Sequence, residues 1–267
     1  MRRQAPLDFN AEHAETARRT QSRRGLRELR AFSAPLRVKA CFFGLRPSPC
    51  PAFVREDPCY AAPMTIRSLF ATRVYEASLA EEPGSGALIA DLEAACLMLA
   101  KEDRAGQAWS RAHGYGGYTS YASLADLPTR ATAFGALKRQ LDRHAARFAA
   151  AAALDLGARR LKLDSLWVNV LKPGGAHSGH IHPHSVLSGT VYVATPPGAA
   201  GLRLEDPRLP MMMAAPTRKA DAPEDLRTFV TLTPSAGTLL MWESWLRHEV
   251  PANGGKAPRI SISFNYA

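Results

Sequence analysis

The sequence predicts an α+β protein in which a C-terminal all-β barrel or jelly roll is backed by helices from the N-terminal part. Two segments before residue 160 repeat apolar residues at helical spacing, and after Gly157 the chain changes to short β-rich stretches. Gly and Pro turns separate these stretches, as they do in barrels and jelly rolls. The 267 residues, 46% of them hydrophobic, are enough to bury a substantial core.

The first 63 residues are predicted to be a disordered or mis-assigned extension, and ordered sequence is expected to begin at Met64. Residues 1–63 are rich in Arg and Pro, and the run from Arg46 to Pro51 suits neither a helix nor a strand. They hold 12 Lys or Arg against 6 Asp or Glu, which leaves only +4 of the formal net charge of +10 for the rest of the chain. A modest excess of this kind is typical of a solvated surface, so nucleic acid as a partner is unsupported.

The composition also bears on the compartment. No apolar run approaches the roughly 20 residues that a membrane-spanning helix needs, so no membrane partner is expected. The four cysteines, Cys41, Cys50, Cys59 and Cys96, contain no Cys-x-x-Cys pair. Reduced thiols and a cytoplasmic location are therefore expected.

Residues 64–160 are expected to form a helical layer within a single domain of residues 64–267. One helix is predicted over residues 87–101, where Leu88, Leu92, Cys96 and Leu99 share a face. A second helix is predicted over residues 132–154, whose apolar residues again recur three and four positions apart. Between them, the segment 109–121 mixes glycines with aromatic residues and is expected to be a loop beside a pocket.

Residues 161–267 are expected to form the β-sheet core. Its strands are predicted over residues 165–171, 188–194, 201–204, 228–233, 238–242 and 260–264. The segment 209–225 is expected to be a long mobile insertion of the kind that often acts as a lid. Just before it, Glu205, Asp206 and Arg208 are expected to form a salt-bridged turn.

A cluster of histidines follows the first of these strands. His177, His180, His182 and His184 fall within eight residues. In an extended strand, residues two apart point to the same face, so His180 and His182 can offer ring nitrogens to one ion. His248 follows the predicted strand 238–242 and is the expected third ligand. Imidazole suits Fe, Zn, Cu and Ni, so the ligand type alone does not choose the metal.

The C-terminal strand has one polar and one apolar face. Arg259, Ser261 and Ser263 alternate there with two isoleucines and a phenylalanine. Arg259 and Ser261 on an inward face would offer a guanidinium fork and a hydroxyl to the distal carboxylate of a dicarboxylate. Tyr192, on the predicted strand 188–194, is expected to add a phenolic hydrogen bond to the same carboxylate.

Taken in order along the chain, these residues show a family resemblance. The chain resembles the iron and 2-oxoglutarate dependent oxygenases, specifically a bacterial and phage group of them. The resemblance runs from about Leu69 to the C-terminus, and it implies a cupin-like double-stranded β-helix with Fe(II) and 2-oxoglutarate as cofactors. It is carried by Trp167-Val-Asn169, Pro173-Gly174, His180-Ile-His-Pro-His-Ser185, Ser188-Gly189, Glu205-Asp-Pro-Arg208, His248 and Arg259-Ile-Ser261.

The resemblance also implies site roles. His180 takes the first ligand position, His248 the distal one, and Arg259 the position that binds 2-oxoglutarate. The family usually has Asp or Glu where this chain has His182. Either a three-histidine site forms, or the ligands shift to His182 and His184.

The activity implied is oxidative decarboxylation of 2-oxoglutarate coupled to hydroxylation of an unidentified substrate, for which a small molecule, a peptide and a nucleobase are all candidates. No catalytic residue is expected beyond the metal centre, and Asn169 is expected to orient a ligand or water near it. Two other classes stay open. A zinc-dependent hydrolase would use the His-x-His-x-His cluster to activate water, and a non-catalytic cupin-like module would only bind a small molecule. The sequence indicates no oligomeric state.

Overall fold

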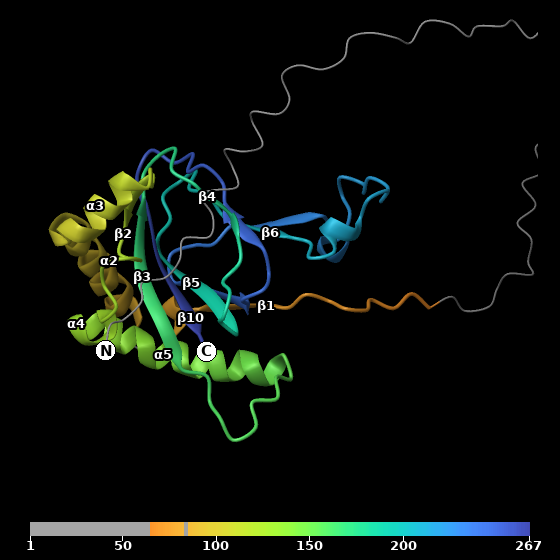
Figure 1. The fold of residues 1–267 in the computed structure, drawn as a ribbon, viewed down its shortest axis with the longest axis horizontal. Coiled ribbons are helices and arrows are strands. Elements are labelled where there is room, and N and C mark those ends of the chain that lie inside the picture. The colour runs from red at the N-terminus through yellow and green to blue at the C-terminus, as the bar shows by residue number, and fades with distance from the viewer. Residues whose placement is uncertain (1–64, 83–84) are drawn as a thin grey trace, which may run out of the picture. The chain divides into compact units, whose positions relative to one another are not determined.

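Two antiparallel sheets form the centre of the fold (Figure 1). The structure is a computed structural model that describes residues 65–82 and 85–267, so the predicted extension 1–63 lies outside the described residues. The larger sheet has the order β1-β8-β5-β10-β3-β2 and the smaller one β4-β9-β6-β7. The strands are β1 (Val74–Ser78), β2 (Gly117–Thr119), β3 (Leu163–Leu171), β4 (His177–His180), β5 (Leu187–Ala194), β6 (Leu202–Glu205), β7 (Phe229–Leu232), β8 (Thr238–Glu243), β9 (His248–Val250) and β10 (Arg259–Tyr266).

From β3 to β10 the chain passes repeatedly between the two sheets. The larger sheet takes β3, β5, β8 and β10, and the smaller one takes β4, β6, β7 and β9. This is the topology of a double-stranded β-helix, so the predicted fold is confirmed. Of the described residues, none belongs to a helix long and apolar enough to cross a membrane.

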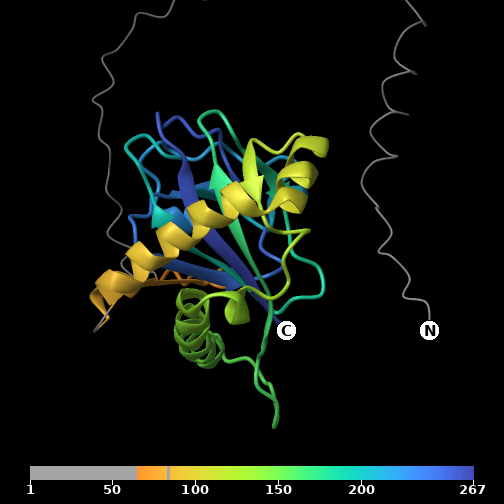
Figure 2. The same cartoon turned by 90° about the vertical axis from the view of Figure 1, so that its left-hand side faces the viewer.

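Helices cover the outer face of the larger sheet, as predicted. Figure 2 shows α2 lying across the strands of this sheet, with α5 at its lower end. Leu92 and Leu137 from these two helices share one buried cluster with Ile262 and Phe264 of β10. The helices are α2 (Ser85–Glu102), α3 (Arg104–Ala112), α4 (Leu127–Arg130) and α5 (Thr132–Ala151), and short 3₁₀ turns occupy Leu79–Glu81, Leu209–Met211 and Glu224–Leu226.

A second apolar cluster fills part of the space between the two sheets. It joins Leu204 of the smaller sheet to Leu240 and Trp242 of the larger one. Side chains along a strand alternate between its faces, so β10 contributes its apolar residues to the helix side and its polar residues to the interior. Arg259 is 2% exposed and Ser261 is also 2% exposed, which agrees with this placement.

The structure differs from the sequence-based expectations in four places. Strands β1 and β2 come from the expected helical layer and extend the larger sheet at its two edges. The first residues of the expected loop 109–121 belong to α3. The helix α5 ends at Ala151, earlier than expected, because Ala153 has a φ of 55°, which a right-handed helix does not accommodate. Strands β4 and β9 were missed because both are short and their pairing shifts register between His177 and His180.

Leu137 tests the packing of helix on sheet. It is fully buried on α5, so substitution by Ala leaves a cavity and should lower the free energy of unfolding by about 2–5 kcal/mol. Arg139→Ala, on the exposed face of the same helix, should change it by less than about 0.5 kcal/mol. Urea unfolding followed by circular dichroism measures both, and equal losses would contradict the described core.

Candidate active site

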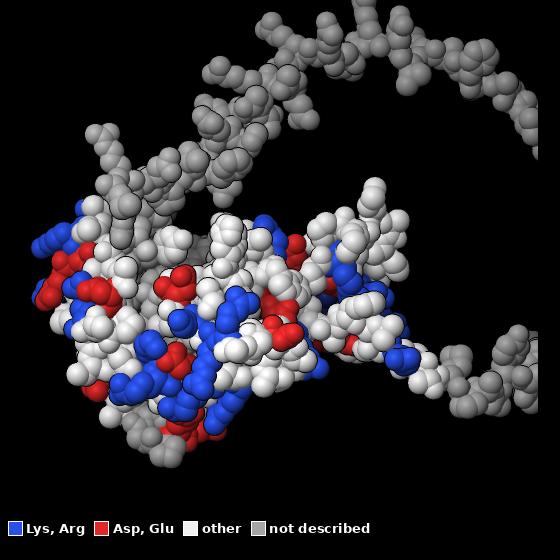
Figure 3. Space-filling view, turned by 60° about the horizontal axis from the view of Figure 1, so that its bottom comes forward, with Lys and Arg blue, Asp and Glu red and all other residues white. Residues whose placement is uncertain are grey.

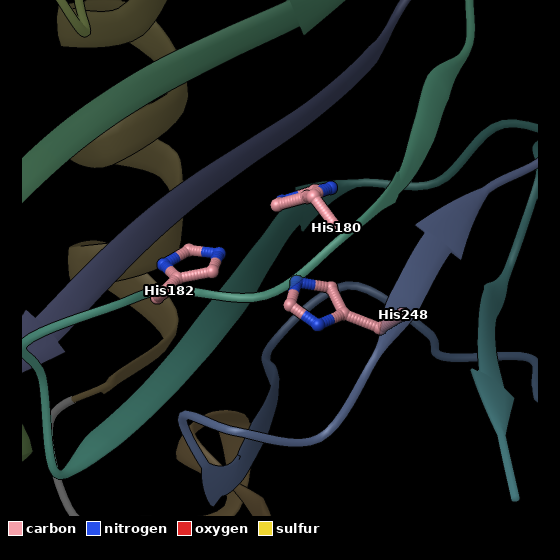
Figure 4. A group of neighbouring side chains, drawn as sticks. All are labelled: His180, His182 and His248. Atoms are coloured by element: carbon pink, nitrogen blue, oxygen red, sulfur yellow. The ribbon is translucent and has the colours of Figure 1, made fainter. Parts of the chain in front are cut away.

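Three imidazole rings converge between the sheets, as Figure 4 shows. His180 ends β4, His248 begins β9, and the two are directly paired across these strands. His182 lies in the loop after β4. One ring nitrogen from each histidine lies within 4.8 Å of the others, and the ring centroids are 4.5 to 5.1 Å apart. The structure therefore brings together the three histidines that the sequence singled out.

His182 reaches the group by a different route from the one expected. The strand ends at His180, so His180 and His182 do not share the face of one regular strand. Instead, the backbone N–H of His182 donates to the carbonyl of Ser244, which follows β8. This bond holds the loop against the other sheet, and the ring turns toward His248.

Hydrogen bonds fix the protonation pattern of the three rings. Nδ1 of His180 lies 2.7 Å from the Ser178 carbonyl oxygen, and Nδ1 of His248 lies 2.9 Å from that of Leu246. Nδ1 of His182 lies 2.7 Å from Oδ1 of Asn265. These oxygens only accept, so each Nδ1 carries the proton and each Nε2 keeps a free lone pair. Nε2 of His182 is buried and has no hydrogen-bond partner in the protein. A buried polar atom normally has a partner, and a metal ion would provide one here.

Burial favours the neutral form of two of these rings, those of His182 and His248. It lowers the pKa of His248 to about 3, with a further contribution from His180. It lowers the pKa of His182 to about 4, although the hydrogen bond to Asn265 acts in the opposite direction. Both rings are neutral near pH 7, which is the form that binds a metal ion.

The other two histidines of the cluster have different surroundings. His184 is exposed, has a φ of 71°, and does not belong to the converging group. His177 lies on β4, where its Nε2 is 2.6 Å from the hydroxyl of Tyr115. The structure thus groups His182 with His180 and His248, and not with His184.

Asn265 supports His182 and was not recognised from the sequence. Its Oδ1 accepts from Nδ1 of His182 and from the Ser188 hydroxyl at 2.8 Å, while its Nδ2 donates to Ser165 at 3.0 Å. The indole of Trp167 stacks near the His182 ring, at 5.9 Å between centroids. The alternation of polar residues along the last strand extends to Asn265, so the sequence could have placed this side chain on the polar face. It could not have shown that Asn265 contacts His182.

Arg259 is a buried cation at the start of β10. Its Nη1 donates to the Ser261 hydroxyl at 3.3 Å, and its Cζ lies 4.7 Å from the ring centroid of Tyr192. Its Nε and the Tyr192 hydroxyl are both buried without a partner. None of the ion pairs among the described residues involves Arg259. A buried guanidinium is costly unless an anion joins it, so these surroundings of Arg259 favour an anionic group beside it.

Asn169 lies in a network beside this pocket. Its Oδ1 accepts from Thr119 at 3.0 Å and from Tyr115 at 3.2 Å, and its Nδ2 donates to Ser263 at 3.1 Å. Its amide is therefore engaged by protein groups. Burial, and then the charge of Arg259, lower the pKa of His177 to about 4, which places the Tyr115–His177 pair close to Arg259.

The turn after β6 agrees with its expected structure. Arg208 donates to Asp206 in an ion pair at 2.8 Å, and Glu205 pairs with Arg247 at 3.2 Å. These charged side chains are therefore engaged in ion pairs within the protein.

The fold and the three converging imidazoles define a metal-binding double-stranded β-helix protein. Residues 165–265 match a protein family described as "Putative 2OG-Fe(II) oxygenase". This part of the chain is therefore similar to the oxygenases that use Fe(II) and 2-oxoglutarate, and the three histidines suit the iron of such an oxidoreductase.

Several solved structures are similar to this chain, and one of them, the first named here, supports the fold. A prolyl-4-hydroxylase from Pseudomonas putida is 19% identical over 73% of this chain and 92% of its own, with a TM-score of 0.50. HygX from Streptomyces hygroscopicus, with nickel and 2-oxoglutarate bound, is 13% identical over 74% and 82% of the two chains, with a TM-score of 0.46. The epimerase SnoN from nogalamycin biosynthesis is 16% identical over 74% and 78%, with a TM-score of 0.49. No curated protein matches the chain.

Asn265 provides a test of the support for His182. Asn265→Leu removes the acceptor of the Nδ1 proton, so the ring loses its orientation and metal affinity should fall by about 10- to 100-fold. Asn265→Asp keeps an acceptor at the same place and should retain the affinity. Titration with Co(II), followed by its visible absorption, measures both variants. Wild-type affinity in the Leu variant would show that this hydrogen bond is not needed.

Proposed function

We propose that this chain is an Fe(II)- and 2-oxoglutarate-dependent dioxygenase in which His180, His182 and His248 hold the iron. In this proposal Arg259 binds the distal carboxylate of 2-oxoglutarate, and an unidentified substrate is hydroxylated. The observation that carries the proposal is the buried Arg259, which has no anionic partner among the described residues and shares the fold with three converging imidazoles.

Charge balance supports the pairing of metal and cosubstrate. The three histidines add no negative charge, and the buried Arg259 is itself a cation. A doubly charged iron ion would therefore leave the interior strongly positive. A dicarboxylate compensates this charge, so we expect the two cofactors to favour each other's binding.

The protein's own residues supply binding and enclosure. Arg259 and the Tyr192 hydroxyl both have unused donors that suit a carboxylate, and Ser261 holds the guanidinium in place. Trp242 lies 4.6 Å from His248 between ring centroids, and together with Leu240 and Leu246 it excludes water from that side. When bound, iron and 2-oxoglutarate supply the oxidising chemistry, since dioxygen is reduced as 2-oxoglutarate is decarboxylated.

A zinc-dependent hydrolase fits the site less well. Such an enzyme needs a group that takes a proton from the metal-bound water, commonly a carboxylate. Within the described part of the chain, the metal-binding group consists of histidines alone. A binding module without catalysis is distinguished from the oxygenase by turnover, because it would not consume 2-oxoglutarate when oxygen is admitted.

The substrate remains open among a small molecule, a peptide and a nucleobase. On the face seen in Figure 3, Lys and Arg gather with Asp and Glu among them. Along α5, Lys138 is paired with Asp142, and Arg143 with Glu82. This mixed surface does not favour a nucleic-acid backbone. We further propose that the protein acts in the cytoplasm, in keeping with the free thiol of Cys96.

Anaerobic addition of Fe(II) and 2-oxoglutarate should give the visible charge-transfer band of a chelated cosubstrate. Arg259→Ala should weaken 2-oxoglutarate binding by about 1.5–3 kcal/mol, on the order of 10- to 100-fold, because a charge-assisted pair is lost. Iron affinity should stay unchanged. Arg259→Lys keeps the charge without the fork and should fall between wild type and Ala. The absence of any band in the wild type would contradict the cofactor assignment.

His182 and His184 form a matched pair of substitutions. His182→Ala removes a proposed ligand and should lower Fe(II) affinity by more than about tenfold. Loss of a hydrogen bond that only orients a ligand already lowers metal affinity by about that much, and loss of the ligand itself should cost more. His184→Ala should leave the affinity unchanged, because its ring is outside the converging group. Isothermal titration of both variants under nitrogen gives the comparison. The reverse order of effects would mean that the ligands shift to His184.

A further inference from the structure

A pocket of about 540 Å³ lies outside the site described so far. One wall is the extended segment 65–73 before β1, and the other is the segment 206–228 between β6 and β7, here called the β6–β7 insert. Figure 1 shows both projecting from the same side of the β-helix. The floor is aliphatic, with Val74, Leu204, Val230, Leu232 and Leu246. The volume is in the range of pockets that bind ligands.

Exposed apolar side chains gather around this pocket. The described part of the chain has thirteen large apolar side chains that are exposed, and seven of them lie on segment 65–73, the β6–β7 insert and the first residue of β7. Phe70 is 94% exposed and has a φ of 58°, which is rare for an aromatic residue. Apolar surface concentrated around a cavity marks an interaction site more often than chance exposure does. These seven residues are Ile66, Leu69, Phe70, Met211, Met213, Leu226 and Phe229.

Of the seven charged residues that line the pocket, five are engaged with other protein groups, and the other two, Arg67 and Glu224, carry opposite charges. Asp206 pairs with Arg208 at 2.8 Å, and Asp225 accepts from Ser68 at 3.3 Å. Arg227 donates through Nε to the carbonyl of Ala222 at 2.6 Å. The rim therefore offers little free charge to a ligand, and the aliphatic floor favours an uncharged, apolar one.

The backbone beside the pocket points to the form of that ligand. Among the described residues, strand β7 is the edge of the smaller sheet and has β6 as its one paired strand. Every second residue of an edge strand presents its N–H and C=O groups away from its neighbour. Thr228, Val230 and Leu232, two residues apart, line the pocket next to this edge. An extended peptide can use both the free backbone groups of β7 and the aliphatic floor. Alternate side chains of a strand point to one face, and its backbone groups form hydrogen bonds with the neighbouring strand.

We propose that this pocket is a docking site for an extended, apolar peptide segment of a partner protein, which adds as a strand to the free edge of β7. Its inward side chains occupy the aliphatic floor, and its backbone pairs with residues 229–232. The pocket is lined by none of the three histidines, Arg259 or Tyr192, so docking is independent of the iron assignment and can be measured on metal-free protein.

The test uses a fluorescein-labelled peptide, acetyl-Lys-Val-Thr-Val-Thr-Val-Lys-amide, and fluorescence anisotropy with the metal-free protein. Recognition through the backbone and aliphatic side chains is tolerant of sequence, so this peptide should bind saturably. Leu226→Asp, at a pocket residue that is 43% exposed, should weaken binding at least tenfold. Leu97→Asp, at a residue of α2 that is 47% exposed and outside the pocket, should not. Absence of saturable binding, or equal losses in both variants, would overturn the proposal.

Two further measurements separate the peptide from other occupants. N-methylation of either the valines or the threonines blocks one edge of the peptide, so at least one methylated form should bind at least tenfold more weakly. Peptide binding should also slow amide hydrogen exchange at residues 229–232. If both methylated forms bind as the parent does, the pocket only adsorbs apolar groups. If sedimentation shows a dimer that Leu226→Asp dissociates, a second copy occupies the pocket.

Discussion

Strand β10 has to satisfy two unlike environments at once. Its apolar residues pack against α2 and α5, while its polar residues line the space between the sheets. Because the two sets alternate, a shift of one residue in register would bury Arg259 among the helices and expose the isoleucines to the polar interior. The pairing of β10 with β3 on one side and β5 on the other fixes this register. Both parts of the active site depend on it, since Arg259 begins the strand and Asn265 nearly ends it.

The metal-binding group is assembled from distant parts of the chain, and each ring is held from behind. Backbone carbonyls orient His180 and His248, and an amide side chain orients His182. A carboxylate at the position of His182 would add negative charge to the site. It would also bind a metal ion without a proton held on a second ring nitrogen. A neutral ring needs an acceptor at Nδ1 to keep Nε2 free, and Asn265 supplies it. The histidine and the asparagine therefore belong together as one arrangement.

Local pattern was enough to predict much of this. Periodicity identified α2 and α5, alternation identified the two faces of β10, and the spacing of histidines identified the three rings that meet. The remaining features depend on long-range contacts that no local pattern encodes. Tyr115 joins His177 across 62 positions, and Asn265 joins His182 across 83. Strand β9 is three residues long, too short for periodicity to show, and was found only through its pairing with β4 and β6.

The central claim is that three histidines and one buried arginine together hold iron and 2-oxoglutarate. A crystal structure of the protein with Fe(II) and 2-oxoglutarate, prepared without oxygen, tests this most directly. The account predicts iron bonded to Nε2 of His180, His182 and His248, with the distal carboxylate of 2-oxoglutarate paired to Arg259. Iron bonded to His184, or a cosubstrate bound away from Arg259, would contradict it.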